Sequence, residues 1–406
     1  MNKLLNFEYA TIHGTYWMIY ASCASFASVF LLGNGYSNSE IGIIMAVANV
    51  LAVVMQPLTA DLADRSKRFS IISITEIMTL MMMVFTAFMF ILHGRTMALF
   101  VIYVLLLAWH TVLQPLFNSL NFKLQECGVH LNFGVCRSMG SLAYSVLCLF
   151  LGDLVERCGI SILPITSEVM MVLLMISIAM TARQYHKVMK VNEKKLAEAK
   201  AKLPAEESEE INLIDFVKRN KLFFVLQIGV LLVFIENQVL NNFMLQIVTN
   251  VGGTETDMGR IFSLMAFLEI PTLFCFDWIN KRFSCGFLLK VASVGFTLKI
   301  GVVFLAQSVA MIFAAQFLQL VSFALFLPAM VHYIDEIMSK GEAVKGQALY
   351  TMMITVSSVL GSLFGGVILD FSGARMLTML STILAAIGTV IVIVMVDKVN
   401  ANLKNS

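Results

Sequence analysis

The chain has 406 residues, of which 59% are hydrophobic and 13% are charged, and its formal net charge at pH 7 is +2. Soluble domains carry about 25% charged residues, so this composition excludes a water-soluble globule. The small net charge also argues against a nucleic-acid-binding protein, whose affinity depends on a strongly basic surface.

Apolar segments long enough to cross a bilayer recur along the chain, separated by short polar loops. One span needs about 20 apolar residues, so the sequence predicts an all-α membrane protein with twelve transmembrane helices in two pseudo-symmetric six-helix bundles. We expect the spans near residues 10–32, 40–62, 70–92, 97–121, 133–153, 164–182, 222–247, 257–279, 284–306, 309–332, 346–370 and 374–396. A polar stretch after the sixth span then divides the chain into an N-terminal bundle (1–182), a linker (183–221) and a C-terminal bundle (222–406).

The loops on the two sides of these spans differ in positive charge. Most Lys and Arg residues lie on the side of the linker, whereas the opposite loops carry Arg95, Arg157, Arg260 and Arg375. Positively charged loops stay in the cytoplasm, so we expect a multi-pass protein of the cytoplasmic membrane with both termini and the linker inside.

Two pairs of prolines indicate an internal duplication. Pro57 and Pro115 fall in the second and fourth spans, and Pro271 and Pro328, almost equally far apart, fall in the eighth and tenth. Parallel repeats with a binding site near the bilayer midplane are an architecture of secondary transporters.

Polar side chains inside the spans are the best sequence indication of a binding site, because an unpartnered polar group in hydrocarbon is costly. Three spans carry them at helical spacing: His13, Tyr16, Trp17 and Tyr20 in the first; His110, Gln114, Asn118, Asn121 and Gln125 in the fourth; and Glu236, Asn237, Gln238, Asn241, Asn242 and Gln246 in the seventh. We interpret the amides as the lining of a cavity for a hydroxyl-rich ligand and the rings as a platform for a sugar or base. The alternative is helix-to-helix hydrogen bonding with an aromatic interfacial belt.

Charged residues within the spans suggest ion coupling. Glu236 and Glu269 lie near mid-depth of the seventh and eighth spans, where a carboxyl group that exchanges a proton could couple transport to a proton gradient. Arg137 shares a face of the fifth span with Tyr144, and Lys299 is a lone cation in the ninth. Each cation needs a partner or a ligand, and a purely structural ion pair is the alternative.

Two segments resemble lactose permease and its relatives in the major facilitator superfamily. Residues 37–68, SNSEIGIIMAVANVLAVVMQPLTADLADRSKR, are similar to the second span and the loop motif that follows it, with Asp64 and Arg65 in the acidic and basic places and Ala60 replacing a glycine. Residues 132–145, NFGVCRSMGSLAYS, resemble the fifth span, in which an arginine binds sugar and an aromatic residue stacks on it. The resemblance places Arg137 and Tyr144 at those positions.

The resemblance also implies roles for residues in other spans. Asn118 stands where the family has a sugar-binding glutamate, and Lys299 matches an arginine of the proton-coupling network. Gln319 and Ser322 replace the histidine and the proton-carrying glutamate of lactose permease, and Glu269 lies one helical turn beyond the family's carboxylate. Lactose itself is therefore not implied.

The resulting hypothesis is a secondary active transporter, similar to the oligosaccharide:proton symporters, that moves a sugar or oligosaccharide with protons by alternating access. The expected substrate-binding residues are Asn118, Arg137, Tyr144, Gln238, Asn242, Glu269, Tyr20 and Gln114, and the expected proton-coupling residues are Glu269, Glu236 and Lys299. Alternatives are the same fold transporting a nucleoside, an aromatic acid or a drug, and a non-transporting membrane receptor or scaffold.

Several motifs are missing from the sequence. It has no nucleotide-binding loop of the GxxxxGK[ST] type and no catalytic or metal-ligand grouping, and its seven cysteines show no paired spacing. We therefore expect no enzymatic activity, no cofactor and no metal. The expected partners are the small-molecule substrate, H+ and the lipid bilayer, with no nucleic acid, and we expect a monomer.

Overall fold

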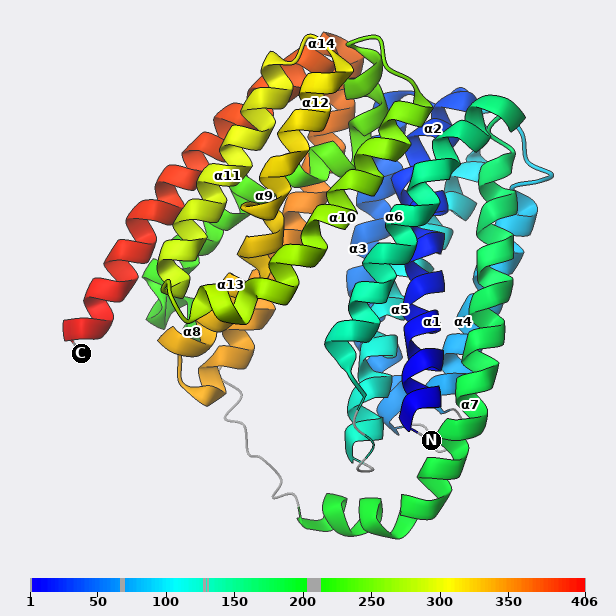
Figure 1. The fold of residues 1–406 in the computed structure, drawn as a ribbon, viewed down its shortest axis with the longest axis vertical. Helices are drawn as coiled ribbons and strands as arrows, with labels where there is room; N and C mark the ends of the chain where they lie inside the picture. Colours follow the sequence, from blue (N-terminus) through cyan, green and yellow to red (C-terminus); the bar gives the residue numbers. More distant parts are fainter. Residues whose placement is uncertain (1, 66–69, 127–128, 130, 203–212, 406) are drawn as a thin grey trace. The chain divides into compact units, whose positions relative to one another are not determined.

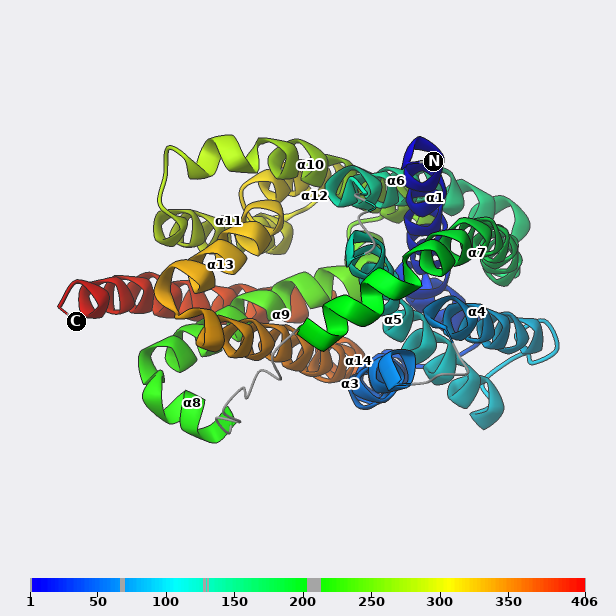
Figure 2. The same cartoon turned by 90° about the horizontal axis from the view of Figure 1, so that it is seen from below.

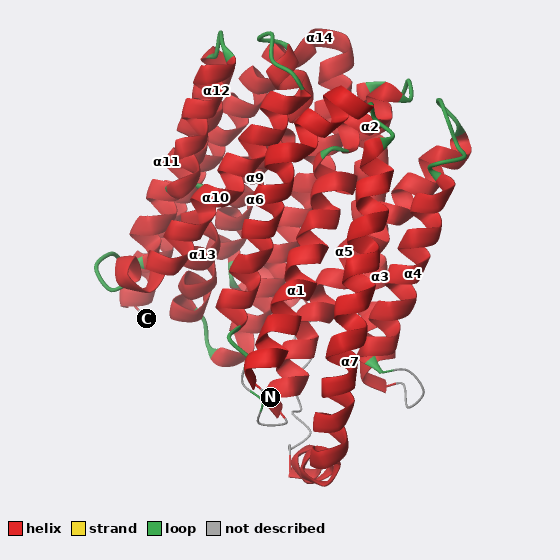
Figure 3. Ribbon diagram, turned by 45° about the vertical axis from the view of Figure 1, so that its right-hand side comes forward, coloured by secondary structure: helices red, strands yellow, loops and turns green. Residues whose placement is uncertain are grey.

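The computed structural model describes residues 2–65, 70–126, 129, 131–202 and 213–405, and within these ranges every regular element is a helix (Figure 3). Ser66, Lys67 and Arg68, which end the loop motif, lie outside the described residues. The chain forms two compact units. Unit 1 comprises Met1–Tyr36 and Val47–Glu206, and unit 2 comprises Ser37–Ala46 and Glu207–Ser406.

Unit 1 is built from the helices of the first six spans: α1 (Asn2–Tyr20), the π-helical turn η1 (Ala21–Ser25), α2 (Ala27–Gly33), α3 (Asn38–Arg65), α4 (Ile71–Phe88), α5 (Met97–Glu126), α6 (Phe133–Cys158) and α7 (Ile162–Lys202). The first nine residues of α3 belong to unit 2, which includes Ser37–Ala46. Helix α1 packs against α6 and α7, and α4 packs against α5 and α7. Helix α7 continues beyond the predicted sixth span into the first part of the linker.

Unit 2 contains α8 (Leu213–Arg219), α9 (Lys221–Thr249), α10 (Glu255–Asn280), α11 (Cys285–Leu305), α12 (Val309–Gln316), the 3-10 turn η2 (Phe317–Leu320), α13 (Phe323–Ile337) and α14 (Lys340–Asn405). Helix α14 reverses direction at Gly373, whose φ of 77° is a conformation that favours glycine (Figure 1). Figure 2 shows the same helices from below.

The predicted fold class is confirmed. In the described residues, 11 helical segments are long and apolar enough to cross a membrane. The last, Gly341–Asn402, is 62 residues long and holds two predicted spans on either side of the kink at Gly373, which accounts for the count of twelve. The four prolines of the repeat each lie inside a helix, in α3, α5, α10 and α13.

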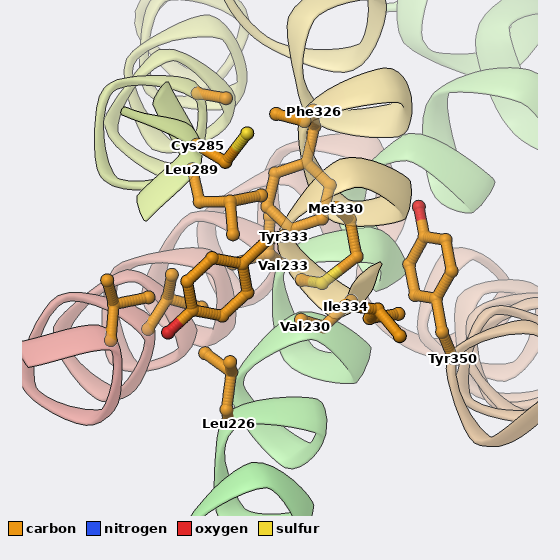
Figure 4. Close-up of a cluster of buried hydrophobic side chains, with 14 of the residues drawn as sticks. Leu226, Val230, Val233, Cys285, Leu289, Phe326, Met330, Tyr333, Ile334 and Tyr350 are labelled. Atoms are coloured by element: carbon orange, nitrogen blue, oxygen red, sulfur yellow. The ribbon is translucent and has the colours of Figure 1, made fainter. Parts of the chain in front are cut away.

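A buried apolar cluster holds the helices of unit 2 together and orients α9 (Figure 4). Leu226, Val230 and Val233 recur at steps of four and three, so they lie on one face of α9. They pack with residues of α11, α13 and α14, among them Leu289, Met330 and Tyr350. Glu236 follows Val233 by three positions and continues this face, which explains why a carboxyl group lies inside the bundle.

Candidate functional site

A chain of buried polar side chains joins four helical segments of unit 2. Lys299 Nζ on α11 lies 3.6 Å from Glu236 Oε1 on α9 and donates a hydrogen bond to Gln319 Oε1 at 3.0 Å. Gln319 Nε2 donates in turn to Glu269 Oε1 on α10 at 3.0 Å. Lys299 and Glu236 are both 0% exposed, and Glu269 is half-buried. The structure thus brings together the three residues predicted for proton coupling, and Gln319 connects them.

Gln319 reaches this position because the tenth span is broken. The span predicted near 309–332 is present as Val309–Ile337, but its helix is interrupted: α12 ends at Gln316, η2 follows, and Ser322 has φ −106° and ψ −103° before α13 begins. Irregular backbone within a span needs neighbours that satisfy its polar groups. The Thr272 hydroxyl supplies one such bond, donating to the Leu320 carbonyl at 3.0 Å.

A glycine allows α11 to approach this break. A Cβ on Gly295 would lie 2.9 Å from the Val321 carbonyl oxygen, closer than real Cβ contacts allow. Gly295 is four positions before Lys299, so the same helix face that contacts the broken backbone carries the ammonium group. The close approach therefore positions Lys299 beside Gln319.

Glu236 is held by charge alone. Neither of its carboxylate oxygens has a hydrogen-bond partner in the described part of the chain, and the same is true of the buried Ser322 hydroxyl. A buried acceptor without a hydrogen bond costs free energy. These atoms therefore have capacity for a proton, a water molecule or a solute hydroxyl.

A second polar site, within unit 1, is an aromatic cluster on α1, α5 and α6. The Arg137 guanidinium lies 4.3 Å from the centroid of the Trp17 ring, in a cation–π contact. Tyr20 and Tyr144 have ring centroids 6.1 Å apart. Tyr16 stacks on His110 of α5 with centroids 4.2 Å apart. The predicted residues Arg137, Tyr144 and Tyr20 are thus brought together.

Two backbone features shape this cluster. A Cβ on Gly140 would lie 2.5 Å from Trp17 Cδ1, so a glycine is needed where α6 crosses α1. The π-helical turn η1 inserts extra backbone directly after Tyr20, and π-helical turns are frequent at functional sites. Ser25 at the end of this turn shares a 2.8 Å hydrogen bond with the Tyr144 hydroxyl.

The predicted amides of α5 lie on the helix that contributes His110 to the cluster. Gln114 and Asn118 are both half-buried. Asn118 Oδ1 has no hydrogen-bond partner among the described residues, and neither do the ring nitrogens Trp17 Nε1 and His13 Nε2. These three atoms of unit 1 therefore have unused hydrogen-bonding capacity.

The predicted amides of α9 are arranged differently. Asn242 Nδ2 donates to Ser362 Oγ on α14 at 2.8 Å, and Gln246 Nε2 donates to Asn38 Oδ1 at 2.8 Å. Gln238 is half-buried and lies beside Gly361 of α14. Asn242 and Gln246 therefore make the helix-to-helix hydrogen bonds that the alternative interpretation predicted.

The beginning of α3 is bound to the C-terminal part of the chain through Asp370. Its Oδ1 accepts hydrogen bonds from Asn38 N at 3.1 Å and Asn38 Nδ2 at 2.9 Å, and its Oδ2 accepts from Ser39 N at 2.8 Å. The carboxylate thus caps the N-terminus of α3. Glycines make the approach possible, because a Cβ on Gly42 or Gly366 would clash with backbone atoms of the facing segment.

Sequence analysis missed four residues of these sites: Ser25, Thr272, Ser362 and Asp370. Each is a polar residue in or at the end of an apolar segment, and that was the only available signal. Their partners are distant in sequence, so spacing alone does not identify them. In the described part of the chain, no group of three His, Cys, Asp or Glu residues is placed to hold a metal ion.

Comparisons with known proteins agree with this architecture. A family model described as "MFS_1 like family" matches residues 9–380. No curated protein sequence matches the chain.

Solved structures match over almost the whole length of the chain. The nucleoside transporter NupG has a TM-score of 0.75 at 15% identity, covering 96% of this chain and 98% of its own. The POT family transporter PepTSo has a TM-score of 0.73 at 10% identity, covering 99% of both chains. A bacterial homologue of the human lysosomal transporter Spinster, in an inward-facing and unoccupied conformation, has a TM-score of 0.67 at 13% identity, covering 98% of this chain and 97% of its own.

At these identities the similar structures show a shared fold, and the family match shows descent. The chain belongs to the MFS_1 like family and is a multi-pass membrane protein with the major facilitator transporter fold.

Proposed function

We propose that the protein is a secondary active transporter that moves a small polar solute of the sugar or oligosaccharide class in symport with protons, by alternating access. Family membership and the transporter fold support the transport activity. The observation that carries the proton coupling is the buried chain from Glu236 through Lys299 and Gln319 to Glu269 at a broken helix.

The charge of this chain suggests how a proton would act. Two carboxylates and one ammonium leave one uncompensated negative charge when all three groups are ionised, and one proton removes it. Uncompensated buried charge is costly, so the closed, desolvated site favours the neutral state. Lys299 contacts Glu236 and reaches Glu269 through Gln319, so protonation of either carboxylate leaves the ammonium paired with the other.

The aromatic cluster of unit 1 supports a sugar as the substrate class. Tyr20 and Tyr144 offer ring faces to the apolar face of a sugar, and the Arg137 guanidinium offers several donors to its hydroxyls. Asn118 Oδ1 has unused acceptor capacity and Trp17 Nε1 has an unused donor. A solute rich in hydroxyl groups can satisfy both kinds of group. Gln114, Gln238 and Asn242 remain proposed binding residues.

We further propose that the linker side faces the cytoplasm, in the cytoplasmic membrane, and that the protein acts as a monomer. The excess of Lys and Arg in the loops of this side supports the orientation.

A nucleoside or an aromatic acid is the second candidate substrate class. The rings of the unit 1 cluster would stack equally well on a nucleobase, and Arg137 would pair with a carboxylate. A thermal-shift panel of sugars, nucleosides and aromatic acids on the purified protein separates the classes, because a ligand that binds the folded state raises its melting temperature. A nucleoside as the sole stabilising ligand would replace the sugar in this proposal.

Transport in proteoliposomes with an imposed pH gradient tests the coupling, using the solute found in the thermal-shift panel. We expect wild-type protein to concentrate the solute. Glu269→Gln keeps the side-chain shape but removes the exchangeable proton, so it should still exchange solute across the membrane without concentrating it. Asp277→Asn is the matched control, because Asp277 is an exposed carboxylate on the same helix. Concentration by Glu269→Gln at the wild-type level would refute the coupling role of Glu269, and a stabilising ligand that is never moved would favour the receptor alternative.

A further inference from the structure

A crevice of about 200 Å³ opens at the end of unit 2 where α9 begins and α13 and α14 end. Its polar lining residues are Asn402 of α14 and the three consecutive residues Arg219, Asn220 and Lys221, where α8 ends and α9 begins. Its apolar lining residues include Phe223, Met338 and Val399. The crevice involves none of the residues assigned to transport above.

We propose that this crevice binds the phosphate group and part of an acyl chain of an anionic phospholipid. The proposal requires that the chain spans a membrane, which the fold establishes, and is independent of the substrate and of proton coupling. The ligand chemistry follows from three features of the crevice, taken in turn below.

The first feature is unused positive charge. The side chains of Arg219 and Lys221 are exposed, and within the described ranges neither makes an ion pair. Their neighbour Lys218 differs, because its Nζ lies 3.7 Å from Asp215 Oδ1. A guanidinium and an ammonium group that line the same crevice suit a phosphate, which the guanidinium can bind through two parallel hydrogen bonds.

The second feature is the start of α9, which also lines the crevice. Asn220 precedes the helix, but its Nδ2 donates to the Phe216 carbonyl at 3.2 Å, and its side chain does not cap α9. The first N–H groups of a helix have no partner within the helix and carry partial positive charge. They therefore add to the attraction that Arg219 and Lys221 exert on an anion.

The third feature decides between a lipid and a soluble anion. A soluble phosphate gains nothing from the apolar lining residues, whereas an acyl chain buries apolar surface against Phe223, Met338 and Val399. Helix α8 packs against α9 and α14, and its Phe216 is fully buried in the apolar cluster that packs α9. Basic residues close to the end of a membrane span attract the anionic head groups of lipids.

Native mass spectrometry of the full-length protein released from nanodiscs tests the proposal. The nanodiscs contain equal amounts of phosphatidylglycerol and phosphatidylcholine, and the readout is the ratio of the two lipids that stay bound. We expect enrichment of phosphatidylglycerol on wild-type protein. Each cation near the membrane surface contributes a factor of roughly five in affinity, so Arg219→Gln/Lys221→Gln should lower the affinity for phosphatidylglycerol by roughly 25-fold and remove its enrichment.

Two further variants make the test specific. Lys218→Gln removes the same charge from the neighbouring position and should leave lipid binding near the wild-type value, because Lys218 is paired and does not line the crevice. Leu222→Trp, which places a larger side chain in the crevice without changing its charge, should also reduce binding.

Three results would overturn the proposal. Equal retention of the two lipids by wild-type protein would remove the preference for an anionic head group. Equal losses in Lys218→Gln and Arg219→Gln/Lys221→Gln would indicate diffuse surface charge. Displacement of phosphatidylglycerol by millimolar glycerol 3-phosphate would assign the site to a soluble phosphate.

Discussion

Removing one partner of the buried pair of Glu236 and Lys299 should lower the free energy of unfolding strongly, whereas replacing both residues should lower it little. Both side chains are 0% exposed and lie 3.6 Å apart. Lys299→Met leaves the Glu236 carboxyl without its cation inside the bundle. The double variant Glu236→Gln/Lys299→Met removes both charges and leaves groups of similar volume.

The structure sets the expected magnitudes. Removing one partner of a buried ion pair costs about 3–5 kcal/mol. The lower end applies here, because Glu236 and Lys299 make no hydrogen bond to each other. We therefore expect Lys299→Met to lower the free energy of unfolding by about 3 kcal/mol. The double variant should lose no more than about 1 kcal/mol, so neutralising Glu236 as well should recover about 2 kcal/mol of the stability that Lys299→Met loses.

Reversible unfolding of unit 2 provides the measurement. Trp17 and Trp109 belong to unit 1, so a background with both replaced by Phe leaves Trp278 of α10 as the fluorescent reporter. Detergent-induced unfolding is then followed by fluorescence for each variant. Lys290→Met is the control on the same helix: Lys290 pairs with Asp397, but their side chains are 26% and 65% exposed, so its loss should cost less than about 1 kcal/mol.

Two outcomes would refute this reasoning. If Lys299→Met and Lys290→Met destabilise equally, the buried Glu236 does not need its cation. If the double variant loses at least as much stability as Lys299→Met, the defect comes from lost packing around Lys299 and not from an unpaired charge.

Three other predictions concern contacts that shape the sites. Gly295→Ala should lower the free energy of unfolding of unit 2 by about 1–3 kcal/mol, because its Cβ would press on the broken backbone, whereas the control Gly301→Ala has 3.7 Å of clearance and should be near neutral in the same unfolding assay. Asp370→Asn should cost about 1 kcal/mol and increase hydrogen exchange of the first α3 amides, because the charged cap on Asn38 and Ser39 is lost; unchanged exchange would contradict the cap. Ser25→Ala should raise the KM for the transported solute with little change in melting temperature, because Tyr144 loses the hydrogen bond that orients its ring, and Ser25→Thr should restore the KM.

Much of this fold follows from short-range properties of the sequence. The length of each apolar segment predicts a span, and the steps of three and four between polar residues indicate which side chains share a helix face. Those properties are local, so they can be inferred from the sequence without knowledge of the partner helix. The structure also brings Arg137, Tyr144 and Tyr20 together in unit 1, and each of the three lies on a face that carries other polar or aromatic side chains.

The contacts between distant segments were not accessible in the same way. The sequence of residues 317–322 is that of an apolar helix. The helix is interrupted there in the structure, where the Thr272 hydroxyl donates to the Leu320 carbonyl and Gly295 leaves room for the irregular backbone. Likewise, the polar residues of α9 follow one helical pattern, yet their partners differ. Glu236 lies beside the ammonium group of Lys299, whereas Asn242 donates a hydrogen bond to Ser362.

Spacing along the chain thus established a membrane protein of twelve spans with polar faces directed away from lipid. Which polar groups meet was established by packing between helices, since the partner of Lys299 depends on the helices that pack around it and on the turn that carries Gln319. The physical reason is that burial of a polar group can be inferred from its own segment, whereas compensation of its charge requires a second group that the chain supplies from elsewhere.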